Sequence, residues 1–247
     1  MRVISYNLRK HAAAHELEEL VDLREADVLC LQEADTAHMP QQLAGLTLAR
    51  ATAQNRLGLA VYYRANMFQL EDVVTLSLKK SLHDILLKPA HERVLAARLR
   101  DIDAGRDVVI ASFHAAPLTA LNSLRRHQIR TALSELQKMG DGVPVLMVGD
   151  YNYPVFKERL SERVRRAGYD LTLSDSRTYT RYRFFKGHYD FATSVGLDIE
   201  KVTTLPQGAS DHLPILVTAT YKRGHRELRV VGDPSQDQET TDEQAAG

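Results

Sequence analysis

Short runs of apolar residues alternate with turn-forming residues along most of the chain. Runs of about five to eleven residues that are rich in Val, Ile, Leu and Tyr favour β-strand over helix. The predicted strands are Val3–Asn7, Val28–Glu33, Leu59–Tyr63, Phe68–Leu78, Arg93–Asp101, Val108–Ala115, Val143–Asn152, His188–Ser194, Val202–Leu205 and Ile215–Tyr221. Several of them are apolar at consecutive positions, which is typical of sheets that are covered on both faces.

Helical periodicity is found in fewer segments. His15–Arg24 and Thr119–Met139 repeat apolar residues at helical spacing, and the second ends at Gly140, a residue that commonly stops a helix. Val155–Ala167 is a shorter and strongly charged candidate. Because strands outnumber helices, the pattern predicts an α/β fold in which two sheets pack together with helices outside.

Composition narrows the class of protein. The chain has 247 residues, of which 44% are hydrophobic and 26% are charged, as in globular proteins with a buried core. The single cysteine, Cys30, excludes an internal disulfide and a zinc site built from cysteines. The apolar runs are far shorter than the roughly 18 residues of a membrane span, and no signal-peptide pattern follows Met1. We therefore expect a cytoplasmic location, no membrane span and no obligate protein partner.

The charge is balanced overall but not along the chain. Lys and Arg total 32, as do Asp and Glu, yet the segment from Gly232 onward holds five acids, no base and no large apolar residue. Such a segment buries too little surface to offset its ordering entropy. We expect one domain over residues 1–224 and an acidic C-terminal extension over 225–247 that is disordered from about 232. Without that acidic part, 32 basic residues face 27 acidic ones.

Polar side chains stand at or near the ends of six apolar strands. Each taken alone fits ordinary turn chemistry, but isolated polar groups are costly to bury, and strand ends on one rim can converge on one cleft. We therefore treat them together as a candidate site. The residues are Asn7, Glu33, His114, Asp150, Asn152, Asp190, Asp211 and His212.

This set of side chains suits metal-assisted hydrolysis of phosphate esters. Carboxylate and amide oxygens are the hard ligands that Mg²⁺ or Mn²⁺ prefers, and two imidazoles can stabilise a phosphate or position water. The sequence lacks the motifs of other hydrolases. It has no H-E-x-x-H zinc motif, no G-x-S-x-G of serine hydrolases and no G-x-x-x-x-G-K-[ST] of P-loop enzymes.

Four short motifs occur in a characteristic order: RVISYN at residues 2–7, LQE at 31–33, GDYN at 149–152 and SDHLP at 210–214. In this order and rough spacing they resemble the endonuclease/exonuclease/phosphatase superfamily, over residues 2 to about 221. The resemblance implies a four-layered α/β sandwich, two packed mixed β-sheets flanked by helices, with a metal site at one rim. It therefore implies that residues 1–224 form a catalytic domain.

The resemblance also implies roles for the polar residues. Glu33 would be the main ligand of Mg²⁺, or of Mn²⁺, with Asn7 and Asp211 completing the metal site. Asp150 and Asn152 would orient the attacking water and the phosphate.

The histidines would act on the scissile phosphate. His212 would contact it or assist proton transfer, oriented by Asp190 through a carboxylate–imidazole hydrogen bond, and His114 would be a second phosphate-contacting imidazole. The implied reaction is in-line attack of water on a phosphate ester.

A basic and aromatic segment, RTYTRYRFFKGH at residues 177–188, provides candidate substrate contacts. Arg177, Arg181 and Arg183 could grip a nucleic-acid backbone while aromatic rings stack on bases. The alternative is a pair of strands whose residues alternate between core and solvent.

The sequence predicts a Mg²⁺-dependent phosphoric ester hydrolase, with a nuclease or phosphodiesterase favoured and DNA or RNA as the candidate substrate. One alternative is an intracellular phosphatase or phosphodiesterase of a small-molecule or lipid phosphate. The other is a non-catalytic binding module on the same fold, which the complete set of polar residues argues against.

Overall fold

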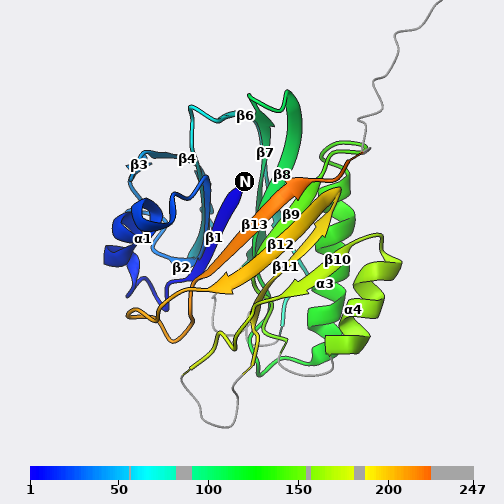
Figure 1. Cartoon of the computed structure of the whole chain (residues 1–247). Coiled ribbons are helices and arrows are strands. Elements are labelled where there is room, and N and C mark those ends of the chain that lie inside the picture. Colours follow the sequence, from blue (N-terminus) through cyan, green and yellow to red (C-terminus); the bar gives the residue numbers. More distant parts are fainter. Residues whose placement is uncertain (56, 82–90, 154–156, 181–186, 224–247) are drawn as a thin grey trace, which may run out of the picture.

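The computed structural model describes residues 1–55, 57–81, 91–153, 157–180 and 187–223 (Figure 1). The predicted C-terminal extension, 225–247, lies outside these residues, as do Arg181 and Arg183. None of the helices in the described ranges is long and apolar enough to cross a membrane.

The described strands form two mixed sheets. The seven-stranded sheet has the order β12-β13-β1-β2-β5-β4-β3, and the six-stranded sheet has the order β10-β11-β9-β8-β7-β6. The first comprises β1 (Arg2–Asn7), β2 (Val28–Ala34), β3 (Gln42–Leu43), β4 (Leu46–Ala51), β5 (Gly58–Tyr63), β12 (Leu197–Thr204) and β13 (Ile215–Tyr221). The second comprises β6 (Phe68–Ser77), β7 (Glu92–Asp101), β8 (Arg106–His114), β9 (Val145–Asp150), β10 (Asp170–Leu173) and β11 (Asp190–Val195).

Helices cover the outer face of each sheet (Figure 1). The short 3₁₀ helix η1 (Ala14–Glu16) leads into α1 (Leu17–Arg24) beside the seven-stranded sheet, whereas α3 (Asn122–Gln137) and α4 (Lys157–Arg166) lie beside the six-stranded sheet. Three separate apolar clusters fill the spaces between these layers. The predicted four-layered α/β sandwich is therefore confirmed.

The uninterrupted apolar runs are explained by burial on both faces of each sheet. In β1, Val3 packs between the two sheets, and its neighbour Ile4 packs beneath α1. In β9, Val148 lies between the sheets and Met147 faces the helices α3 and α4. Because side chains of a strand alternate between faces, a strand in the middle of four layers needs apolar residues at every position.

A small buried polar network joins the sheets beneath the rim. The Gln32 amide nitrogen donates hydrogen bonds to the hydroxyls of Ser112, at 2.9 Å, and Ser5, at 3.2 Å. The Ser112 hydroxyl in turn donates to the Leu31 carbonyl at 3.0 Å. Ser5 and Gln32 belong to one sheet and Ser112 to the other, so these bonds fix the two sheets relative to each other.

The predicted elements are found with adjusted ends, and three short strands were missed. The helix predicted from His15 begins as a 3₁₀ turn, and β9 ends at Asp150 rather than Asn152. The missed strands β3, β4 and β10 carry few consecutive apolar residues; β3 and β10 are the outermost strands of their sheets, where one side has no strand neighbour.

Gly149 permits a close approach of β8 to β9 just before Asp150. Its φ is +146°, and a Cβ at this position would lie 2.0 Å from the backbone oxygen of Phe113. An alanine side chain would therefore push apart two paired strands at the rim.

We predict that Gly149→Ala lowers the free energy of unfolding by about 3 kcal/mol, because backbone atoms of β8 cannot rotate away from the added methyl group. Gly105→Ala is the matched control, since Gly105 also has a positive φ, +64°, but nothing within 4 Å of the added Cβ. Urea denaturation of both variants would measure the difference, and equal losses would contradict this explanation.

Candidate active site

Three predicted site residues lie in one row across the six-stranded sheet. His114 at the end of β8 is paired with Asp150 at the end of β9, and Asp150 is paired with Asp190 at the start of β11. Strands β8 and β9 are parallel, whereas β9 and β11 are antiparallel. The ends of β8 and β9 and the beginning of β11 therefore lie together at the same rim.

The seven-stranded sheet supplies Asn7 to this row. Asn7 ends β1, and its amide nitrogen donates a hydrogen bond to Asp150 Oδ2 at 3.1 Å. The backbone N–H of Arg9 donates to Asn7 Oδ1 at 3.0 Å, which holds the amide in this orientation. Asn7 and Asp150 thus connect the two sheets at the rim.

Asp150 Oδ2 is the centre of the site. Besides Asn7, the Asn152 amide nitrogen lies 3.1 Å away, and the Nε2 atoms of His114 and His212 each lie 3.7 Å away. The residue is 1% exposed. Burial, together with the negative charges of Asp190 and Glu33, raises the pKa of Asp150 to about 7, although His212 opposes this shift.

Asp190 and His212 form a buried ion pair. His212 Nδ1 lies 2.8 Å from Asp190 Oδ2, and both residues are buried. Burial alone would lower the pKa of His212, but the carboxylates of Asp190 and Asp150 outweigh it and raise that pKa to about 10. The hydrogen bond between Asp190 and His212 is the one that the resemblance implied, and it leaves Nε2 facing Asp150.

The loop that carries His212 is held by residues whose part the sequence did not reveal. The Ser210 hydroxyl donates to the Asn7 carbonyl at 2.6 Å and accepts the His212 N–H at 3.1 Å. The Glu16 carboxylate accepts hydrogen bonds from the Ala209 N–H and, at 3.0 Å, from the Tyr6 hydroxyl. The sequence did not single out Glu16, because it is one of several polar residues in the predicted helix His15–Arg24.

Glu33 lies where the pairing of β2 with β5 is irregular, and its φ is +54°. A left-handed conformation is unfavourable for glutamate and persists where surrounding contacts enforce it. Here the Lys10 N–H donates to Glu33 Oε2 at 2.8 Å and the His11 N–H donates to the Glu33 carbonyl at 2.9 Å. Asn152 also has a positive φ, +48°.

Asp211 contacts a cation that the sequence had not singled out. Its Oδ2 lies 3.8 Å from Arg9 Nε, and the Arg9 side chain is 46% exposed. The backbone carbonyl of Asp211 accepts a hydrogen bond from the Thr180 N–H at 2.9 Å. Thr180 therefore lies beside the loop of Asp211 and His212.

The predicted site residues divide into two groups. Those in direct contact around the Asp150 carboxylate are Asn7, His114, Asp150, Asn152, Asp190 and His212. Glu33 and Asp211 flank this group through the loop of residues 9–11. Arg177 is exposed and is not drawn into the contacts described above.

One group of donors among the described residues of this rim could hold a divalent metal. Asp150, Asp190 and His212 each place one donor atom within 4.8 Å of the others. His212 Nδ1 already bonds to Asp190 Oδ2, which leaves His212 Nε2 as the ring nitrogen that faces Asp150. Glu33, Asn7 and Asp211, the metal ligands that the resemblance implies, carry the oxygen donors that suit Mg²⁺, and their role as ligands stays a prediction.

Carboxylates outnumber cationic side chains among the described residues of the site. Among its described residues, four carboxylates (Glu33, Asp150, Asp190 and Asp211) face the cationic side chains of Arg9 and His212. Burial is the main cause of the raised pKa of Asp150, and the negative charges of Asp190 and Glu33 add to it. A bound cation fits a site in which carboxylates outnumber cationic side chains.

Comparison with known proteins places the chain among phosphoesterases. The model of the endonuclease/exonuclease/phosphatase family matches residues 4–212. Protein angel of Drosophila melanogaster is 27% identical over an alignment of 149 residues, and the match covers 55% of this chain and 41% of that protein. The chain thus spans less than half the length of this curated relative.

Two solved structures show the same fold. TDP2 of D. rerio in complex with a single-stranded DNA product has a TM-score of 0.72 and 13% identity, over 89% of this chain and 98% of the other. The mannosyl-6-phosphatase of Bacteroides thetaiotaomicron has a TM-score of 0.71 and 16% identity, over 90% and 100%. The match over residues 4–212 confirms the resemblance of the four motifs, and the chain belongs to the endonuclease/exonuclease/phosphatase family.

Proposed function

We propose that the protein is a Mg²⁺-dependent phosphodiesterase that acts as a nuclease, by in-line attack of water on a phosphodiester. The observation that carries this proposal is the arrangement around Asp150, where two imidazoles and two amides converge on one buried carboxylate at the rim of both sheets. Membership of a family of phosphoesterases supports it. A cytoplasmic location stays a prediction from the sequence.

His212 and His114 would bind the phosphate. The Asp190 carboxylate holds the His212 ring at 2.8 Å and favours its protonated form, so Nε2 can donate to a phosphate oxygen or a leaving oxygen. His114 Nε2 lies at the same distance from Asp150 Oδ2 as His212 Nε2, which suits two contacts to one phosphate group.

Asp150 and Asn152 would position the attacking water. The amides of Asn7 and Asn152 fix Asp150 Oδ2, which can accept a hydrogen bond or a proton from water. Glu33, with Asn7 and Asp211, would hold Mg²⁺. When bound, the metal would neutralise charge on the phosphate and polarise it toward attack.

The arginines of the segment 177–188 and two structural neighbours indicate the class of substrate. Arg177, with Arg181 and Arg183 of the segment after Thr180, would contact the backbone of DNA or RNA. A neighbour in fold was crystallised with single-stranded DNA product, which supports a nucleic-acid substrate. Another neighbour is a mannosyl-6-phosphatase, and it supports the alternative of a small phosphate ester.

A screen with and without excess EDTA tests the proposal, using plasmid DNA, an abasic duplex, RNA, bis-p-nitrophenyl phosphate and p-nitrophenyl phosphate. We expect Mg²⁺-dependent cleavage of a nucleic acid and of the small diester. Turnover of the monoester alone would favour the phosphatase alternative, and no turnover of any substrate would favour a binding module.

We predict that Glu33→Gln lowers kcat by a factor of at least about 10³, because the amide removes a negative ligand without changing shape. Glu25→Gln is the matched control, since Glu25 also has a positive φ, +46°, and its carboxylate pairs with Arg2 at the surface. Circular dichroism would confirm that both variants fold. Near-wild-type turnover of Glu33→Gln would refute the assigned ligand.

We predict that Asp190→Asn moves the pKa of His212 from about 10 toward its ordinary value of 6.5, because the largest charge that raises it is removed. A raised pKa stabilises the fold fully below 6.5, and this contribution is lost as the pH rises through 10. The free energy of unfolding of the variant should therefore fall furthest below that of the wild type at pH values under 6.5.

The measurement is an NMR titration of the His212 ring in EDTA-treated protein, with urea denaturation at several pH values. Asp170→Asn, an exposed aspartate of the same sheet, serves as the control. An unchanged His212 titration in Asp190→Asn would show that the ion pair does not set the protonation of the imidazole.

A further inference from the structure

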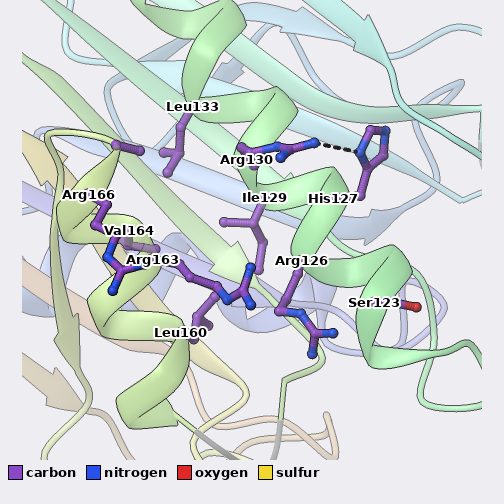
Figure 2. A pocket seen from close by; sticks show the side chains of 11 residues that line it. Ser123, Arg126, His127, Ile129, Arg130, Leu133, Leu160, Arg163, Val164 and Arg166 are labelled. Atoms are coloured by element: carbon purple, nitrogen blue, oxygen red, sulfur yellow. Dashed lines mark hydrogen bonds between the residues drawn. The ribbon is translucent and has the colours of Figure 1, made fainter.

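A groove of about 590 Å³ lies between α3 and α4, on the outer side of the six-stranded sheet (Figure 2). Its floor is apolar: Ile129 and Leu133 from α3 and Leu160 and Val164 from α4 line it, and all four are buried. The floor therefore belongs to the packed core, and only the walls are available for contacts with a ligand.

The walls of the groove are strongly basic. They carry Arg126, Arg130, Arg163 and Arg166, with His127 beside them, and none of the lining residues is a carboxylate. Arg126 and Arg163 extend into the space between the two helices (Figure 2). Guanidinium groups from two helices thus surround one channel and repel one another.

Helix stability explains only part of this charge. Arg163 and Arg166 stand in the last turn of α4, where the helix dipole favours cations, and Arg166 also pairs with Glu162. Arg126 and Arg130 lie four residues apart in the first two-thirds of α3, which has no acid in its first turn. Like charges at this spacing destabilise a helix, so these arginines are better explained by a ligand.

One residue of the groove, Arg126, contacts the segment that directly follows the candidate active site in the chain. Arg126 Nη1 donates to the Tyr153 hydroxyl at 3.2 Å, and Tyr153 follows Asn152 directly in the chain. The same chain segment leads from β9, which ends at Asp150, to α4. An extended ligand with one group at Asp150 could therefore continue between α3 and α4.

We infer that this groove binds the phosphate backbone of a single strand of nucleic acid, away from the scissile phosphate, and this inference rests on the proposed nuclease function. Guanidinium groups match phosphate oxygens in geometry and charge, and a row of them suits a chain with regularly spaced phosphates. Because the groove is hollowed between two helices, it suits an extended strand better than the flat surface of a bilayer.

The test uses the double variant Arg130→Gln/Arg163→Gln and fluorescence anisotropy in EDTA, where no hydrolysis occurs. Labelled oligothymidylates of about 20 and about four nucleotides and an oligouridylate of about 20 serve as probes. We expect about tenfold weaker binding of both long strands and a salt slope smaller by about 1.4, for two lost phosphate contacts. Binding of the short strand should not change.

Arg165→Gln is the matched control, because Arg165 is an exposed arginine of α4 that does not line the groove. Hydrolysis of bis-p-nitrophenyl phosphate should be equal in the wild type and both variants. Unchanged binding of the long strands, or an equal loss in Arg165→Gln, would overturn the inference. Loss of binding to phosphatidylserine vesicles, with oligonucleotide binding intact, would overturn it in favour of a membrane surface.

The two proposals can fail separately. If the wild type hydrolyses no phosphodiester, the proposed function fails, whatever the anisotropy shows. If the wild type cleaves the long strand and the double variant does so with the same KM, the function stands and the groove inference fails.

Discussion

The buried carboxylate of Asp150 is the constraint around which the rest of the site is arranged. A carboxylate removed from water is stable only when hydrogen bonds or opposite charges surround it. Asn7 provides one bond from the opposite sheet, Asn152 provides another from the following loop, and two imidazoles lie nearby. The packing of two sheets and the geometry of the site therefore depend on the same contacts.

Contacts below and beside the rim keep this arrangement rigid. The bonds between Gln32 and Ser112 join the sheets beneath Asp150, and the absence of a side chain at Gly149 lets β8 and β9 approach closely. On the other side of the site, Glu16 and Ser210 hold the loop that carries His212. A site built from both sheets needs such cross-links, because neither sheet alone contains all of its groups.

Unfavourable backbone conformations are concentrated at the site. Among the described residues, seven other than glycine have a positive φ, and five of them, Arg9, Lys10, His11, Glu33 and Asn152, lie at the rim. Hydrogen bonds between the 9–11 loop and Glu33 hold the conformations of that loop and of Glu33. Strain of this kind persists at functional sites because the surrounding structure determines the backbone there more strongly than local preference does.

The sequence by itself determined the strands, their burial on two faces and the chemical nature of the site, because strand propensity and polar strand ends are local signals. It did not reveal the strands β3, β4 and β10, because these segments have few consecutive apolar residues. Only the tertiary structure decided that Asp190 meets Asp150 through antiparallel pairing, that Glu16 holds the His212 loop, and that arginines of α3 and α4 share a groove. These contacts join residues far apart in the chain, and they follow from strand register and helix placement, which no local pattern encodes.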